Sequence, residues 1–172
     1  HADTPVLDVL ATILAGGRAS RLVRAARDRR LVSNVNAFAY TPTEIGVFVV
    51  HAVARPETTA AAARAIWDQL RRVRDGEITE GEVERARRLL EAQWLRRMES
   101  PEGQANFLGS WELLGDWRRG VDYHERLHET DAARITAAAA RWLDPAAAGL
   151  IAYRPRGTPA LGRDAAWVRA VL

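Results

Sequence analysis

The sequence predicts an α+β fold in which long helices are layered on one face of an antiparallel or mixed sheet. Three short β-rich segments, at residues 35–41, 45–54 and 147–154, are separated by helical patterns without a regular βαβ alternation. A chain of 172 residues with 48% hydrophobic and 27% charged residues is ordinary for one globular domain with a sizeable core. We therefore expect a single domain built from one sheet and one helical layer.

The first half of the chain predicts two helices and a hairpin. Apolar residues recur at helical spacing from Val6 to Leu14, and Gly16-Gly17 marks the end of that helix, although a glycine pair before a helix at Ser20 could also form an anion-binding turn. The segments 35–41 and 45–54 are separated by Pro-Thr-Glu, which indicates a β-hairpin with one largely buried strand.

The second half is predicted to be helical until the last strand. Residues 57–76 form one helical pattern, and Thr79 with Glu82 makes a capping box that opens a long helix through Met98. Pro101 breaks that helix and can start the next one. Asp131 is placed to cap a helix that ends at Asp144-Pro145, before the strand at residues 147–154.

Composition narrows the possible partners. All 25 basic residues are arginine, and 22 acidic residues leave a formal net charge of +3. Because arginines and acids are interleaved along the helical patterns, we expect solvated helix faces and no nucleic-acid partner. No apolar run approaches the ~20 residues that cross a membrane, so we expect a soluble protein with no membrane partner. The absence of cysteine excludes disulfides and thiolate metal sites without indicating a compartment, and the localisation stays unknown.

One short motif suggests a zinc site. His124, Glu125 and His128 follow the H-E-x-x-H pattern, in which two imidazoles one turn apart bind zinc and the glutamate acts as general base. A third ligand is missing, because Asp131 and Arg134 occupy the positions of the Gly and His in the long zincin motif. An independent zincin-type metallopeptidase is therefore kept as an alternative function, and we expect no metal ligands in this chain.

Three segments in the same order and spacing carry a family resemblance: residues 7–38, 80–100 and 135–155. Together they resemble the C-terminal half-domain of the pitrilysin/insulinase family of zinc metallopeptidases, which includes the mitochondrial processing peptidase. The resemblance implies a half-domain over residues 1–155, a C-terminal tail at 156–172, and a processing-peptidase-like metallohydrolase fold that lacks its first strand. We expect such a sheet to pair with an upstream segment, with a second copy in a homodimer, or with the tail.

The resemblance also implies a function. Members of the family enclose a peptide in a chamber between paired domains, and the zinc motif H-x-x-E-H belongs to an N-terminal domain. This chain contains no such motif. We therefore expect a non-catalytic, substrate-enclosing domain that is inactive alone, with no catalytic residues and no cofactor of its own. The expected partners are a zinc-bearing catalytic half or subunit and a peptide substrate; a degenerate scaffold is the further alternative.

The same resemblance implies a substrate-binding residue. Active members use an arginine and, a few residues later, a tyrosine to hold the substrate and the developing oxyanion. Arg27 matches the arginine, whereas the tyrosine position falls near Ser33, and Tyr40 lies seven residues further along. Arg27 could bind a peptide carbonyl or carboxylate, although a plain surface arginine beside Asp28 is an open alternative.

The remaining distinctive residues have structural explanations. His51 alternates with apolar neighbours and is predicted to be a hydrogen-bonded strand histidine. The tryptophans lie on separate helical patterns and are predicted to be core or domain-contact anchors. They are Trp67, Trp94, Trp111, Trp117, Trp142 and Trp167.

Overall fold

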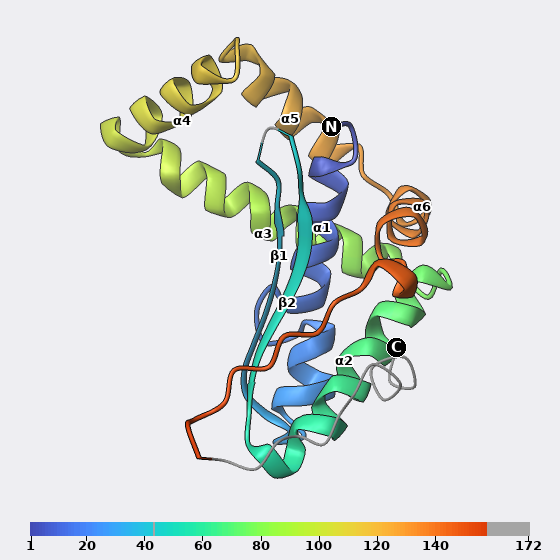
Figure 1. The fold of residues 1–172 in the computed structure, drawn as a ribbon. Coiled ribbons are helices and arrows are strands. Elements are labelled where there is room, and N and C mark those ends of the chain that lie inside the picture. The colour runs from blue at the N-terminus through green and yellow to red at the C-terminus, as the bar shows by residue number, and fades with distance from the viewer. Residues whose placement is uncertain (43, 158–172) are drawn as a thin grey trace.

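The computed structural model describes residues 1–42 and 44–157, and Figure 1 shows their arrangement. The helical elements are α1 (Thr4–Ala15), the π-helix η1 (Val23–Arg27), the 3-10 turn η2 (Pro56–Thr58), α2 (Thr59–Arg74), α3 (Glu80–Met98), α4 (Pro101–Leu113), α5 (Arg118–His128), α6 (Ala132–Trp142) and the 3-10 turn η3 (Pro145–Ala147). The strands are β1 (Val32–Tyr40) and β2 (Val47–Ala54). The predicted α+β class, with helices on one side of an antiparallel sheet, is confirmed.

The predicted hairpin is present, and β1 begins three residues earlier than the pattern indicated. β1 pairs with β2 antiparallel, with Val35 opposite Ala52 and Ala37 opposite Val50. Side chains alternate across a sheet, so Val35 and Ala37 are buried on the face that meets α1, whereas Phe38 is 42% exposed on the other face. The sheet therefore has one covered face and one open face.

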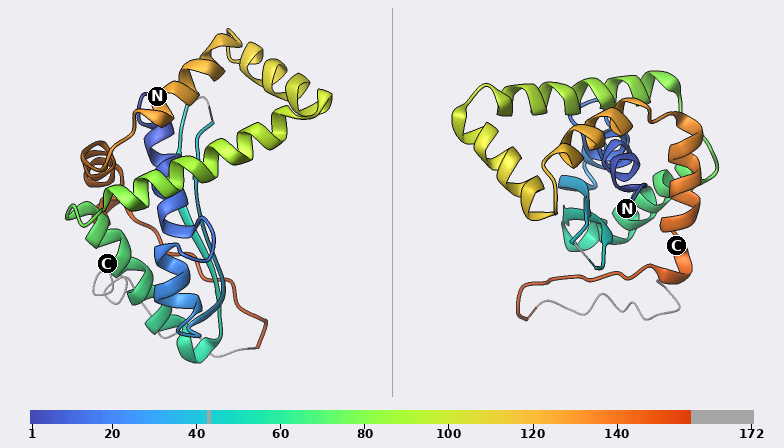
Figure 2. Two further views of the ribbon diagram at one scale, coloured as in Figure 1. Left: turned by 180° about the vertical axis from the view of Figure 1, so that it is seen from behind. Right: turned by 90° about the horizontal axis from the view of Figure 1, so that it is seen from above.

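Helix α1 lies at the centre of the core. It contacts β1, α3, α5 and α6, and Figure 2 shows it enclosed by these elements. Leu10 and Leu14 are fully buried and Ile13 is 1% exposed, so the helix is covered on most of its circumference. A helix that is apolar nearly all round is stable only in such an interior position.

The local helix signals are confirmed by the observed caps. Thr79 accepts a hydrogen bond from the Glu82 backbone N–H, and the Glu82 carboxylate accepts one from the Thr79 N–H, which completes the capping box. Ser100 and Asp131 cap α4 and α6 in the same way, through their side-chain oxygens. These groups satisfy backbone donors that a helix start leaves unpaired.

The predicted third strand is wrong. Residues 148–154 follow η3 as an extended segment that belongs to no strand, and Tyr153 is 94% exposed. The segment crosses the hairpin in the view of Figure 1 and is set apart from it in the view from above in Figure 2. An apolar extended sequence becomes a strand only when a neighbouring strand offers its backbone groups, and neither described strand pairs with residues 148–153.

The tryptophans divide between the interior and the surface. Trp67 is buried, Trp94 and Trp111 are half-buried, and Trp117 and Trp142 are 38% and 44% exposed. Trp167 and most of the predicted tail, residues 158–172, lie outside the described residues. No helix in the described part of the chain is both long and apolar enough to span a membrane.

Candidate functional site

Arg27 ends the π-helix η1, which replaces the regular helix that the sequence predicted after Ser20. The Asp28 N–H donates to the Val23 carbonyl and the Leu31 N–H donates to the Ala26 carbonyl, both over 2.9 Å and both spanning five residues. Val23 and Ala26 are buried, so they anchor the widened turn against the core. Arg27 consequently stands on the exposed side, and its guanidinium has no hydrogen bond or ion pair with any described residue.

The connection from Arg27 to the sheet is irregular. Arg30 has φ 58°, a left-handed conformation that costs a non-glycine residue roughly 1–2 kcal/mol. Ser33 is the extra residue between the pairs Val32–Ala54 and Asn34–Val53, where the register of the hairpin shifts. π-Bulges, strained φ values and β-bulges recur at functional sites, and all three occur here within eleven residues.

Ser33 occupies the place where the family resemblance expects a tyrosine. Its side chain is exposed, and its hydroxyl donates to the Val53 carbonyl over 3.2 Å. Tyr40 ends the same strand and is 60% exposed. Seven residues of strand separate the two by about 23 Å, so the Tyr40 hydroxyl cannot reach the position of Ser33.

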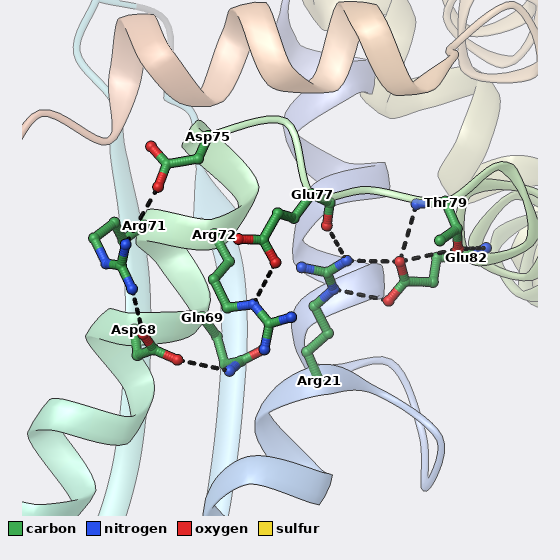
Figure 3. A network of polar contacts seen from close by, with 9 residues as sticks. All are labelled: Arg21, Asp68, Gln69, Arg71, Arg72, Asp75, Glu77, Thr79 and Glu82. Carbon is green, nitrogen blue, oxygen red and sulfur yellow. Dashed lines mark hydrogen bonds and ion pairs between the residues drawn. The ribbon is translucent and has the colours of Figure 1, made fainter.

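A buried ion pair supports the helical turn that precedes Arg27. Figure 3 shows Arg21 directed at Glu82: Nε donates to Oε1 over 2.7 Å and Nη2 to Oε2 over 2.6 Å. Nη2 also donates to the Glu77 carbonyl. Burial by itself would raise the pKa of Glu82, but the hydrogen bonds from Arg21 and the Thr79 N–H outweigh it and lower the pKa to about 2. The bidentate pair thus joins η1 to the start of α3 with both charges compensated.

Sequence reasoning missed this pair. Glu82 was identified through its capping role, which depends on residues three positions apart. Arg21 lies 61 residues from Glu82, so no local pattern connects the two. No sequence signal marks Arg21 as buried, and only the structure shows it enclosed together with its neighbours Ser20 and Leu22.

The residues of the H-E-x-x-H motif lie on α5, as expected, in two different environments. The His124 ring packs against Trp94, 4.5 Å between ring centroids, and against Phe107 at 6.1 Å. Burial, with the nearby charges of His128 and Arg97, lowers the pKa of His124. Glu125 and His128 are exposed, and the described residues contain no group of three His, Asp or Glu side chains that could hold a metal ion.

His51 lies on the open face of the sheet, opposite Asn36. It lies on β2, so the predicted strand position is confirmed, but it is exposed and its imidazole makes no hydrogen bond within the described residues, so the predicted hydrogen bond is wrong. The reason is that this face of the sheet is open: an exposed imidazole can bond to water and needs no partner in the protein. Gly16 and Gly17 end α1, with Gly17 at φ 88°, in agreement with the turn predicted there.

Comparisons with known proteins agree with the fold. The family described as the peptidase M16 inactive domain matches residues 1–90, just over half of the chain. An uncharacterized zinc protease of Streptomyces coelicolor is 29% identical over 117 residues, which are 67% of this chain and 26% of that protein. The chain therefore spans about a quarter of the length of this relative.

Solved structures share the same arrangement. A candidate zinc protease of Bordetella pertussis Tohama I is 27% identical, with a TM-score of 0.73 over 83% of this chain and 79% of that one. The inactive peptidase domain of a candidate zinc protease of Bordetella parapertussis superposes with a TM-score of 0.77, at 24% identity, over 93% of this chain and 88% of that one. The match over residues 1–90 includes α1, η1, the hairpin and the capping box, and it shows that the chain belongs to the peptidase M16 inactive domain family.

Proposed function

We propose that this domain is a non-catalytic wall of a peptide chamber, completed by a partner half that carries the catalytic zinc. The observation that carries the proposal is the two-sided sheet. Helices cover one face, whereas the open face presents Phe38, Val47 and Val53, which are 42%, 51% and 48% exposed. An apolar surface of this kind suits the backbone and side chains of an extended peptide, which a closed helical layer would exclude.

Arg27 is proposed as the polar contact of this wall. Its guanidinium is exposed, lacks a partner among the described residues and is held on a turn anchored by buried Val23 and Ala26. A guanidinium can donate two parallel hydrogen bonds to a peptide carbonyl or carboxylate. With Ser33 in place of the expected tyrosine, we infer that Arg27 binds the peptide without a phenolic partner to stabilise an oxyanion.

The zinc and the hydrolytic chemistry are assigned to the partner half, on this polypeptide or on a separate subunit. The domain over residues 1–155 then contributes shape and binding only. We expect the purified chain to hold no stoichiometric zinc after dialysis and to hydrolyse no peptide. One tightly held zinc per chain, lost in His124→Ala, would instead favour the zincin alternative.

The wall can be tested with a photoreactive amino acid. We would place p-benzoylphenylalanine at Phe38 on the open face, and at Leu113, which is 90% exposed on α4, as the control. A long unstructured peptide should cross-link to the position of Phe38 and not to that of Leu113, with the chain alone and with the zinc-bearing half added. Equal labelling at both positions, or none at Phe38, would identify the domain as a scaffold that has lost peptide binding.

The role of Arg27 is measured separately, by fluorescence anisotropy of the same peptide. Loss of a bidentate contact in Arg27→Ala should weaken binding about tenfold, which corresponds to ~1.4 kcal/mol. Arg118→Ala on α5 removes an exposed charge of the same sign and is the matched control. An affinity that stays within a factor of about two in Arg27→Ala would make Arg27 a surface charge only.

A further inference from the structure

A second polar feature includes Arg24, which lies on η1 three residues before Arg27, and it has no role in the proposed wall. It is an open hollow of about 400 Å³, which we call the arginine hollow, lined by Arg21, Arg24, Ala25, Gln69, Arg72 and Glu82. The hollow joins three segments of the chain: the turn that includes η1, the last turns of α2 and the start of α3. Three of its six lining residues are arginines.

The inner wall of the hollow is preorganised. Arg21 is 9% exposed and is held by both carboxylate oxygens of Glu82 and by the Glu77 carbonyl. Glu82 is fixed in turn by the Thr79 N–H. A guanidinium held by three hydrogen bonds loses little conformational freedom when it meets a ligand, which favours binding.

The rim of the hollow carries unused donors. Arg72 is oriented by one hydrogen bond from Nε to Glu77 Oε2, over 2.7 Å, and Figure 3 shows its guanidinium beside that of Arg21, with Glu77 contacting both. Its two Nη groups have no partner among the described residues. Arg24 is exposed, and its side chain makes no hydrogen bond or ion pair within the described part of the chain.

The charges of the hollow do not cancel. Glu82 is occupied by Arg21 and Glu77 by Arg72, so the charge of Arg24 remains uncompensated. The surplus continues along the chain, because arginine recurs every third residue at positions 18, 21, 24, 27 and 30 and Asp28 is the only acid in that stretch. Guanidinium groups that converge on a small open space form an oxyanion site, and planar guanidinium favours carboxylate and phosphate groups in particular.

We propose that the arginine hollow binds an oxyanion through Arg24 and Arg72, and that this oxyanion is the side-chain carboxylate of an acidic residue in the bound peptide. That the carboxylate belongs to a bound peptide rests on the proposed function, whereas the binding of an oxyanion in the hollow does not. The hollow would then select peptides that carry an Asp or Glu side chain.

The experiment follows the arginine Nε–Hε and backbone amide signals of the ¹⁵N-labelled chain by NMR. Four probes are titrated at equal ionic strength: sodium chloride, inorganic phosphate, a short peptide with a central Glu, and the same peptide with Gln. We expect saturable shifts at Arg24, Ala25 and Arg72 with phosphate and with the Glu peptide, and at least fivefold weaker binding of the Gln peptide.

The variants separate the hollow from general charge. Arg24→Gln combined with Arg72→Gln should abolish saturation, and Arg118→Gln, which removes one distant positive charge, should keep it. The oxyanion site is overturned if phosphate and the Glu peptide shift the signals no more than sodium chloride does. It is also overturned if the shifts are equal in the double variant and the wild type. Binding of phosphate with equal affinity for the Glu and Gln peptides keeps the site and overturns the peptide carboxylate as its ligand.

These outcomes remain distinct from those of the proposed function. Cross-linking at Phe38 does not depend on an acidic side chain in the peptide. If the peptide cross-links at Phe38 but no probe gives saturable shifts in the hollow, only the present inference is rejected. If phosphate binds saturably but the peptide does not cross-link, only the chamber wall is rejected.

Discussion

At the scale of single residues, the pair formed by Arg21 and Glu82 determines how η1 is attached to the helical layer. Taking two charges out of water is costly, and the cost is met only when each charge is paired and hydrogen-bonded. Here both oxygens of the Glu82 carboxylate accept hydrogen bonds from Arg21, and Oε2 accepts another from the Thr79 N–H. Removal of either partner would leave an uncompensated charge below the surface of the arginine hollow.

Glu82→Gln should lower the free energy of unfolding by about 3 kcal/mol, because the Arg21 charge stays buried without its counterion. Chemical denaturation monitored by circular dichroism measures the change. Glu84→Gln is the matched control on the same helix, since Glu84 pairs with Arg87 and Arg88 at the surface, and it should change stability little. Equal effects of the two substitutions would contradict the importance of the buried pair.

The pH dependence of stability follows from the same pair. The pKa of Glu82 is lowered from 4.5 to about 2, so the folded state binds this proton less readily than the unfolded state. The contribution of the pair is therefore complete above pH 4.5 and is lost as the pH falls toward about 2. Wild type should lose stability across that range more steeply than Glu82→Gln.

At the scale of elements, the contact between α4 and α5 depends on one small residue. A Cβ atom on Gly120 would lie 2.5 Å from Phe107 Cζ and 2.5 Å from Trp111 Cδ1, both on α4. Such a distance is shorter than carbon atoms tolerate, so α5 approaches the aromatic side of α4 only because position 120 has no side chain. This close approach also holds His124 against Trp94 and Phe107.

Gly120→Ala should destabilise the protein by about 1–3 kcal/mol, because overpacking between α4 and α5 exceeds the gain in helix propensity. Gly109→Ala is the control: a Cβ atom there meets nothing within 4 Å, so propensity alone acts and stability should rise by up to ~1 kcal/mol. Thermal unfolding of both variants checks the opposite signs. A rise in the melting temperature of both variants would contradict a close contact between α4 and α5 at Gly120.

At the scale of the whole molecule, the described sheet has two strands and therefore two unpaired edges. A two-stranded sheet is marginal in water without further support, and α1 supports only one of its faces. Open edges accept other extended segments, and β2 is rich in valine, which favours such pairing.

We predict that the hairpin gains a further strand from an upstream segment of the full protein, from a second copy of the chain, or from the C-terminal tail. Hydrogen exchange of the outward-facing β1 and β2 amides, together with sedimentation velocity over a range of concentrations, distinguishes these sources. Protection that grows with concentration indicates a second copy, and protection that does not indicates the tail. Unprotected edge amides in a monomer at every concentration leave only an upstream segment as the donor, and similar exchange in the full protein would contradict the prediction.

What the sequence by itself determined is local. The capping box at Thr79, the helix start at Pro101, the cap at Asp131 and the hairpin all depend on residues within a few positions of one another. Their backbone preferences and hydrogen bonds act before distant parts of the chain meet, so the pattern is sufficient to predict them. The substrate-binding role of Arg27 follows only from the family resemblance and stays a prediction.

The tertiary structure decided what depends on distant partners. Residues 147–154 have the composition of a strand, yet Ala147 ends the turn η3, and residues 148–153 are extended and exposed without belonging to a strand. Arg21 found its partner 61 residues away, and His124 gained an aromatic environment from two other helices. Burial, ion pairing and sheet pairing depend on which residues are neighbours in space, and local sequence patterns do not specify those neighbours.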